Sequence, residues 1–275
     1  MTSAGLNKLR VLIFLAVVPG CVGAQANQAA SDCSSSEVVL QRYVDAVGGK
    51  AVFDVQSRVM TAAESNSFGF GSVIEHYTYK LKWKAPNKIT AGSTPYLFNT
   101  IPVSYPNGTF IFDGEGWSNF DRRKSRNEEG EPERVRELRH KYPYNEDPFF
   151  MELRVVADPL MMTRANDLYA SLELDTESNG QQGLCVLRGN GIGKFGFKRH
   201  DLLFFDAKTG FLKTWQVGIQ HKWYTFEFND YRKVDSVMFP FYVYFDFYDA
   251  TFRYTSVVQN KPLDDSAFVE KPASP

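Results

Sequence analysis

The pattern of hydrophobic and polar residues changes along the chain from a helical period to a strand period. Apolar residues between Val38 and Val44 recur three to four positions apart, which predicts an amphipathic helix. Ser35 or Ser36 is suited to its N-cap, and the Gly48-Gly49 pair is suited to its end. From Val59 onward apolar and polar residues alternate instead, and this period of two indicates β-strands.

The segment 76–84, HYTYKLKWK, has the clearest alternation. Its aromatic and aliphatic residues point to one side and its histidine, threonine and lysines to the other, as in an antiparallel strand with one buried face. The apolar set is Tyr77, Tyr79, Leu81 and Trp83. Further strands are predicted at 88–92, 97–104, 107–113, 116–121, 168–174, 183–189, 198–206, 211–219, 222–229, 238–248 and 251–258.

A charged loop and a helical insert, together about 122–163, separate two groups of strands. Residues 122–143 are a dense run of charges, typical of a solvated loop and an exposed helix. A helix is predicted to begin at Asp147-Pro148 and to be interrupted at Asp158-Pro159. The predicted class is α+β and mainly β: a large curved antiparallel sheet or unclosed barrel of about ten or eleven strands, with a few helices covering or plugging its concave side.

Residues 1–26 have the pattern of a secretory signal peptide. A short basic region precedes an apolar run, Val11 to Val18, that is shorter than the ~20 residues of a membrane-spanning helix, and Ala24-Gln25-Ala26 matches a cleavage site. Alternatively, Cys21 in the segment VPGC is a lipidation site. Either interpretation predicts an exported protein, periplasmic or associated with the outer membrane, without a transmembrane span. Residues 27–35 are expected to be a flexible lead-in, and 36–272 a single domain.

The composition excludes one class of partner and leaves the cysteines open. The formal net charge is −1, so no broad basic field favours nucleic acid. Cys33 and Cys185 are the cysteines that remain after cleavage at the A-x-A site. They either form a disulfide, which an exported protein can retain, or stay as two thiols with Cys185 buried in a strand.

The motifs that resemble chemical sites are better explained as turns and loops. Asp113-Gly114-Glu115-Gly116 has a counterpart at 206–210, and both combinations of Asp and Gly indicate hairpin turns rather than a calcium loop with its many oxygen ligands. The G-x-G-x-x-G sequence at 191–196 leads into a strand, not into the helix that a dinucleotide requires. The histidines lack metal-site spacing and no G-x-S-x-G motif occurs, so we predict no metal, no cofactor and no catalytic residue.

Aromatic residues dominate the strands near the end of the chain. In 241–248 we expect Phe241, Val243, Phe245 and Phe247 on one face and tyrosines on the other, with a similar arrangement around Phe226 one hairpin earlier. These residues either fill a core or line a cavity on the concave side of the sheet.

Several segments, in this order and spacing, resemble the bacterial outer-membrane lipoprotein-sorting proteins, the superfamily of the periplasmic carrier LolA and its receptor LolB. They are VLQRYVDAVGG, KAVFDVQSRVM, YKLKWKAPNKIT, FDGEGW, FFDAKTGFLKTW, DYRKVDSVMFPFYVYF and QNKPLDDSAFVEKP. The resemblance implies an unclosed barrel around helices, with a hydrophobic cavity for the acyl chains of a lipid or lipoprotein. The insert at 147–163 would be a movable lid, with methionines that adapt to irregular ligands, unless it is permanent core.

The resemblance implies a ligand-binding set rather than a catalytic one. Arg58 is the candidate for the interior arginine of the carriers. The cavity residues are expected to be Arg58, Tyr79, Trp83, Trp117, Leu160, Met161, Met162, Phe226 and Phe245. We therefore expect a non-enzymatic envelope protein that binds a hydrophobic ligand, with an envelope protein as a further partner. The alternatives are a hydrolase-like enzyme assembled from distant residues such as His200, and a scaffold that binds its partner at the sheet edge.

Overall fold

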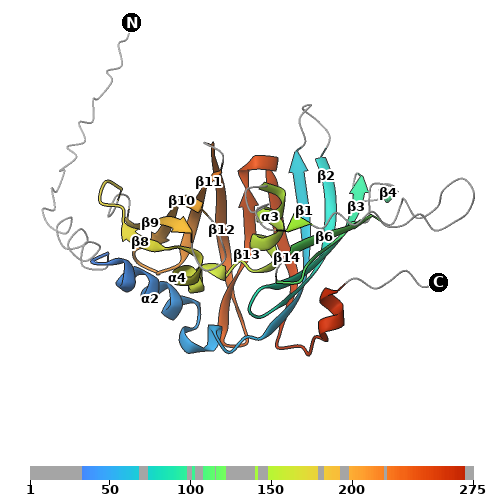
Figure 1. Cartoon of the computed structure of the whole chain (residues 1–275), viewed down its shortest axis with the longest axis horizontal. Coiled ribbons are helices and arrows are strands. Elements are labelled where there is room, and N and C mark those ends of the chain that lie inside the picture. Colours follow the sequence, from blue (N-terminus) through green and yellow to red (C-terminus); the bar gives the residue numbers. More distant parts are fainter. Residues whose placement is uncertain are drawn as a thin grey trace, which may run out of the picture.

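The chain forms one antiparallel sheet that does not close on itself. The computed structural model describes residues 33–67, 74–97, 101–102, 108–114, 116–121, 140–141, 148–178, 183–192, 198–219 and 222–269. Within these ranges 14 strands form a single sheet, and its order runs from β7 at one end to β8 at the other (Figure 1). The predicted fold class is thereby confirmed. The predicted leader 1–26 with Cys21, and nearly all of the charged loop, lie outside the described residues.

The strands follow the order β7-β6-β5-β3-β2-β1-β14-β13-β12-β11-β10-β9-β8, and β4 pairs with β3. Their bounds are β1 Ser57–Ser67, β2 Ile74–Lys84, β3 Lys88–Leu97, β4 Ile101–Pro102, β5 Gly108–Phe112, β6 Gly116–Asp121, β7 His140–Lys141, β8 Ser171–Leu174, β9 Leu184–Ile192, β10 Lys198–Asp206, β11 Leu212–Ile219, β12 Lys222–Val234, β13 Val237–Phe245 and β14 Ala250–Gln259. The helices are α2 Ser36–Val47, α3 Pro148–Ala157 and α4 Ala165–Leu168, with 3-10 turns η1 Gly49–Val52, η4 Met161–Arg164, η6 Asp246–Tyr248 and η7 Asp265–Phe268.

The helix α2 forms as its sequence predicts and is fixed at both ends. The Ser35 hydroxyl accepts a hydrogen bond from Val38 N at the first turn. At the other end Gly48 has φ +131°, and a Cβ there would lie 2.7 Å from the Ser236 carbonyl oxygen, so glycine is required. A disulfide joins Cys33, just before the helix, to Cys185 in β9, with Cα atoms 5.3 Å apart.

The two motifs with Asp and Gly are both hairpin corners. Phe112 pairs with Trp117 across β5 and β6. In the second corner, Asp206 Oδ1 accepts hydrogen bonds from the backbone amides of Lys208 and Thr209, as Asp does in turns. The glycine motif at 191–196 joins antiparallel strands, since Ile192 of β9 pairs with Lys198 of β10. The strand–helix arrangement of a dinucleotide site is therefore not present here.

The strand bounds differ from the prediction in several places, and three of the differences have a clear cause. One strand, β3, runs through Pro95, because β4 and β5 pair with β3 on either side of this proline and leave it without a partner on that edge. The strand predicted to start at 168 begins at Ser171, because α4 occupies Ala165–Leu168. The strand β13 ends at Phe245, so Phe247 is 42% exposed instead of continuing the buried face.

Helix α3 lies within the curve of the sheet, near its centre in Figure 1, and contacts β2 and β3, and the turn η4 that follows it contacts α2 and α4. The helix ends at Ala157, where Pro159 prevents its continuation, as predicted. From residue 151 onward, where the structure describes the side chains of this insert, its large aliphatic residues are buried: Met151, Leu153, Val155, Val156, Leu160, Met161 and Met162. Within the described ranges, no helix is both long enough and apolar enough to span a bilayer.

Candidate functional site

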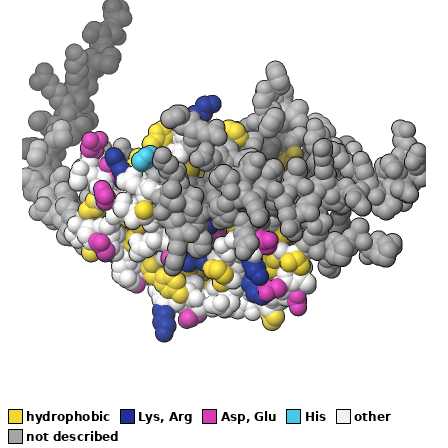
Figure 2. Space-filling view, in the orientation of Figure 1, with side chains coloured by type: hydrophobic (Ala, Val, Ile, Leu, Met, Phe, Trp, Pro, Cys, Tyr) yellow, Lys and Arg dark blue, Asp and Glu magenta, His cyan; other side chains and the backbone are white. Residues whose placement is uncertain are grey.

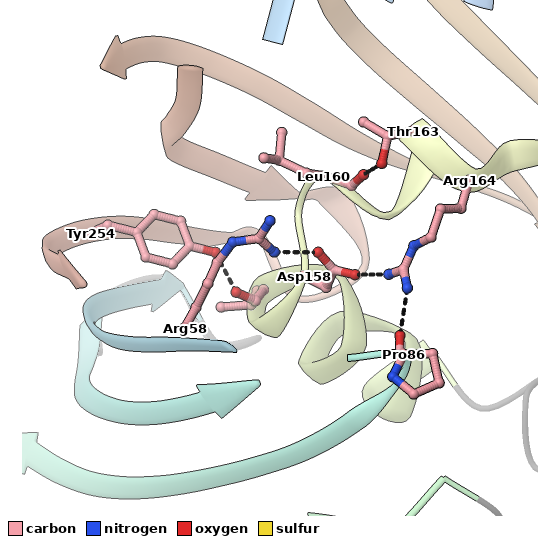
Figure 3. A network of polar contacts seen from close by, with 8 residues as sticks. Arg58, Pro86, Asp158, Leu160, Thr163, Arg164 and Tyr254 are labelled. Atoms are coloured by element: carbon pink, nitrogen blue, oxygen red, sulfur yellow. Dashed lines mark hydrogen bonds and ion pairs between the residues drawn. The ribbon is translucent and has the colours of Figure 1, made fainter. Parts of the chain in front are cut away.

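One carboxylate and two guanidinium groups meet under the end of α3. Asp158 Oδ1 accepts a hydrogen bond from Arg58 Nη1 at 2.7 Å, and Asp158 Oδ2 accepts one from Arg164 Nη2 at 2.5 Å (Figure 3). Arg58 comes from β1, Asp158 directly follows α3, and Arg164 ends η4. The arginine–aspartate cluster (Arg58, Asp158, Arg164) therefore connects the insert to the middle of the sheet.

The backbone around Asp158 positions this carboxylate. Asp158 N still donates to Arg154 O, so the residue completes the last helical turn before Pro159. The Thr163 hydroxyl donates to Leu160 O at 2.8 Å and supports the turn that follows. Arg164 then reaches back across the insert, and its Nη1 donates to Pro86 O at 2.6 Å (Figure 3). The cluster thus depends on the helix break that the sequence predicts.

Aromatic rings hold the two guanidinium groups. The guanidinium carbon of Arg58 lies 4.5 Å from the Trp83 ring centre, and that of Arg164 lies 5.5 Å from it. Phe239 lies 5.8 Å from Arg58 on another side. Trp83 is placed there by the register of the sheet, which pairs it directly with Arg58.

The cluster is largely buried, and burial shifts the pKa values of Arg58 and of the nearby Tyr43. The side chains of Arg58 and Asp158 are 2% and 6% exposed, and that of Arg164 is 26% exposed. Burial lowers the pKa of Arg58, while the charge of Asp158 acts in the opposite direction. Burial, and then the charge of Asp158, raises the pKa of Tyr43 well above its usual range. Asp158 and Arg58 therefore lie within electrostatic reach of the Tyr43 hydroxyl.

Two buried donors near the cluster have no hydrogen-bond partner within the described part of the chain. They are Arg58 Nε and the Tyr43 hydroxyl, and both side chains are at most 2% exposed. Tyr254 differs, because its hydroxyl donates to the Val156 carbonyl of α3. Unsatisfied buried donors are unusual, since each loses its hydration without compensation.

Two small cavities adjoin the cluster. One, of about 60 Å³, is bordered by Arg58, Trp83, Asp158 and Arg164 and has apolar walls from residues that include Val52, Val55 and Leu160. The other, of about 20 Å³, lies between Trp83, Asp158, Arg164 and the side chains of Arg154 and Met161. A wider groove of about 470 Å³ lies outside, between α2 and residues 163–166.

A second buried polar group connects α3 to the sheet. Glu152 of α3 and Glu64 of β1 are 2% and 4% exposed, and Tyr79 of β2 hydrogen-bonds to Glu64. Burial, and then the charge of Glu64, raises the pKa of Glu152 well above its usual range. Glu152 Oε2 has no hydrogen-bond partner within the described residues. This carboxyl is therefore held neutral to higher pH than an exposed glutamate.

The structure brings some of the proposed cavity residues together and separates others. Arg58, Trp83 and Leu160 border the larger cavity, and Trp83 and Met161 border the smaller. Tyr79 lies beside Phe252, and Met162 is buried in η4. Phe226 and Phe245 stack on each other at 4.2 Å in the packed core under β12 and β13. The side chain of Trp117 lies outside the described residues.

The sequence analysis missed Asp158 and Arg164 as site residues, and also Glu64 and Glu152. A signal for three of them was present, because Glu152, Asp158 and Arg164 are charged residues inside an otherwise apolar segment, MELRVVADPLMMTRA. Charges that face a core are costly unless they are paired, so such a segment indicates buried ion pairs. Glu64 lies in a polar stretch of sequence and carries no such signal.

The region around His200 does not assemble as an acid–base pair. His200 is exposed, and its Nδ1 lies 2.8 Å from Asn190 Oδ1. Asp201 points to the opposite face, where it is fully buried and accepts hydrogen bonds from Tyr169 and Trp215. Within the described ranges, no group of three or more histidine, cysteine, aspartate or glutamate side chains is placed to hold a metal ion.

No family model matches the chain, and no curated protein matches it either. Solved structures do. A LolA superfamily protein from Nitrosomonas europaea is 13% identical, with a TM-score of 0.58 over 86% of this chain and 98% of that one. A DUF1329 family protein from Desulfovibrio piger has a TM-score of 0.54 at 10% identity, over 85% of this chain and 96% of that one.

A third structure is described as a putative outer membrane lipoprotein-sorting protein domain from Vibrio parahaemolyticus. It has a TM-score of 0.50 at 10% identity, over 78% of this chain and 89% of that one. At these identities the likeness concerns the fold. The chain therefore has the LolA-like fold.

Proposed function

We propose that this LolA-like chain is a non-enzymatic carrier of the bacterial cell envelope. It is exported to the periplasm or to the outer membrane, and it binds the acyl chain of a lipid or lipoprotein. The acyl chain of the ligand occupies the space on the concave side of the sheet that α3 and η4 fill in the structure. An envelope protein would deliver or receive this ligand.

The observation that carries the proposal is the burial of a short apolar insert against a much larger curved sheet. Met151, Leu153 and Leu160 are at most 2% exposed, and Leu81 and Ile89 on the strands that α3 contacts are at most 1% exposed. Their contacts are apolar and nondirectional, so an acyl chain would satisfy the same surface. Each methylene group removed from water contributes about 0.8 kcal/mol. A ligand chain would therefore offset the loss of the contacts that the insert makes.

A few polar contacts at the C-terminal side of the insert hold it in place. They are the arginine–aspartate cluster, the bond from Arg164 to Pro86 O and the bond from Tyr254 to Val156 O. Movement of residues 148–164 away from the sheet would break these contacts and leave the β-strand ladder intact. The names of two structural neighbours, a LolA superfamily protein and a lipoprotein-sorting domain, support a carrier role on this fold.

The test is uptake of a polarity-sensitive fluorescent fatty acid by the purified protein, together with mass spectrometry of lipid that copurifies with it. Leu81→Asp places a charge on the buried face of β2 that the acyl chain would contact, and should abolish uptake. Val258→Asp is the matched control, because Val258 is 48% exposed on β14 and a charge there remains in water. Circular dichroism verifies that each variant is folded, and Leu81→Asn provides a milder change if Leu81→Asp is not. Equal uptake by folded Leu81 variants and by Val258→Asp would contradict the proposed site.

A further inference from the structure

The arginine–aspartate cluster carries one more positive than negative charge. Two guanidinium groups share one carboxylate, and each carboxylate oxygen is already occupied by one of them. Arg58 is 2% exposed, so its charge cannot be screened by bulk water. Movement of the insert would take Asp158 away and leave Arg58 as an unpaired buried cation, which is costly, and an anion in the place of Asp158 would remove that cost.

The unused donors of the cluster are suited to an oxyanion. Within the described residues, Arg58 makes its hydrogen bond through Nη1, and its Nε has no partner. A guanidinium has five N–H donors in a planar fork that matches a carboxylate or phosphate group.

The size and walls of the adjoining space limit what can enter. The cavity of about 60 Å³ beside Arg58 exceeds the space for one water molecule but cannot hold an acyl chain. Its border combines two guanidinium groups with apolar side chains such as Leu160, and Leu160 belongs to the insert that an acyl chain would replace. A small charged group attached to a hydrophobic chain matches both parts of this border.

We propose that Arg58 on β1 binds the anionic headgroup of the carried amphiphile, a carboxylate or a phosphate, in place of Asp158 once the insert has moved, while the acyl chain lies where Leu160 and Met161 now pack. This inference rests on the proposed carrier function and adds the charge of the ligand to it. Trp83 keeps the guanidinium plane of Arg58 in position, because its ring lies 4.5 Å from this group and both residues belong to the sheet. A neutral ligand of the same chain length would leave the Arg58 donors unsatisfied.

Displacement of the fluorescent fatty acid tests this inference. Palmitate and hexadecanol share a chain and differ in headgroup charge, and at about pH 8 the acid is ionised. The wild-type protein should bind palmitate about tenfold more tightly than hexadecanol, as expected for charge-assisted hydrogen bonds. Lysophosphatidic acid replaces the carboxylate by a phosphate and identifies which headgroup is preferred. Acetate and inorganic phosphate, which lack a chain, should not compete.

Substitutions at the proposed site test whether it causes the preference for palmitate over hexadecanol. Arg58→Gln should remove the preference for palmitate, and Arg58→Lys should reduce it, because lysine keeps the charge but lacks the planar set of donors to which the unused Nε belongs. Arg188→Gln is the control, since it breaks the pair of Arg188 on β9 with Asp175, far from the cluster in sheet order. If Arg58→Gln does not fold, Arg58→Lys decides.

Three results would overturn the inference, and they differ in what they leave standing. Equal affinity of the wild type for palmitate and hexadecanol would refute the anion site but keep the carrier function. Competition by acetate or phosphate as strong as that by palmitate would indicate a site for free anions. Failure of every amphiphile to bind would refute the carrier function itself.

Discussion

Arg58 and Asp158 form a buried ion pair, Nη1 to Oδ1 at 2.7 Å, although 100 positions separate them in the chain. The pair joins β1, in the middle of the sheet, to the end of helix α3. The pair therefore fixes the insert to the core of the sheet, and movement of the insert would break it.

Removing one partner of this pair should strongly destabilise the protein. Asp158→Ala leaves two guanidinium groups without their carboxylate, and loss of one partner of a buried pair costs about 3–5 kcal/mol. Urea unfolding at neutral pH measures the change. Arg232→Ala, which breaks a pair with Asp230 whose side chains are 59% and 44% exposed, should cost less than about 1 kcal/mol. Similar losses for the two variants would show that burial of the cluster contributes nothing.

The stability of the protein should fall as the pH rises, because of Glu152. Burial and the charge of Glu64 raise the pKa of Glu152 in the folded state, whereas the unfolded chain releases this proton near pH 4.5. The folded state then binds more protons, so the free energy of unfolding decreases from about that pH up to the raised pKa. The groups that face Glu152 from β1 and β2 are Glu64 and Tyr79.

Glu152→Gln separates this effect from other titrations. The amide cannot ionise, so thermal unfolding of this variant should depend less on pH between about pH 5 and pH 8 than unfolding of the wild type. Glu173→Gln on edge strand β8, where the glutamate is exposed, should retain the wild-type slope. A slope that is unchanged in Glu152→Gln would assign the pH dependence to other groups.

Loss of the disulfide should weaken the attachment of α2. Cys33 and Cys185 lie 152 positions apart, and removal of a native disulfide costs about 2–5 kcal/mol, partly through the entropy of the unfolded chain. Cys33→Ser with Cys185→Ser should unfold at lower urea concentration than the oxidised wild type. Reduction of the wild type should produce most of the same shift. No shift on reduction would show that the bond does not form in the purified protein.

Gly189 should not tolerate a side chain. A Cβ at this position would lie 2.6 Å from the ring of Tyr169, which hydrogen-bonds to buried Asp201. Gly189→Ala should therefore cost about 1–3 kcal/mol, as overpacked cores do. Gly92→Ala is the control in another strand, because its nearest neighbours would be 3.9 Å away. Equal stability of the two variants would mean that Tyr169 moves aside without cost.

Local chemistry made much of the fold predictable from the sequence. The N-cap at Ser35, the hairpin after Asp206 and the helix break at Pro159 each depend on residues within a few positions of one another. The alternation in 76–84 placed Tyr79, Leu81 and Trp83 on the buried face, because strand geometry alone determines which side they occupy.

The candidate site was harder to predict from the sequence than the fold, because its residues are far apart in the chain and meet only after folding. Arg58 was expected at the site through a family resemblance, but no rule of spacing connects it to Asp158 or Arg164. Asp158 was interpreted as a helix boundary, which it is, and its second role as a buried counter-ion follows from the packing of α3 onto the sheet. The end of β13 at Phe245 likewise reflects the turn η6, which the alternation of aromatics conceals.

The pairing of β1 with β14 has a consequence for how the molecule is made. The first and last strands lie side by side in the middle of the sheet, and the bond from Thr255 to Thr61 spans 194 positions. The strands β1–β7 and β8–β13 pair mainly with strands close in sequence and can form early, whereas the ladder between β1 and β14 must wait for the last strand to be synthesised. High contact order of this kind slows folding. The nascent chain therefore exposes two unpaired inner strand edges until its C-terminal residues arrive.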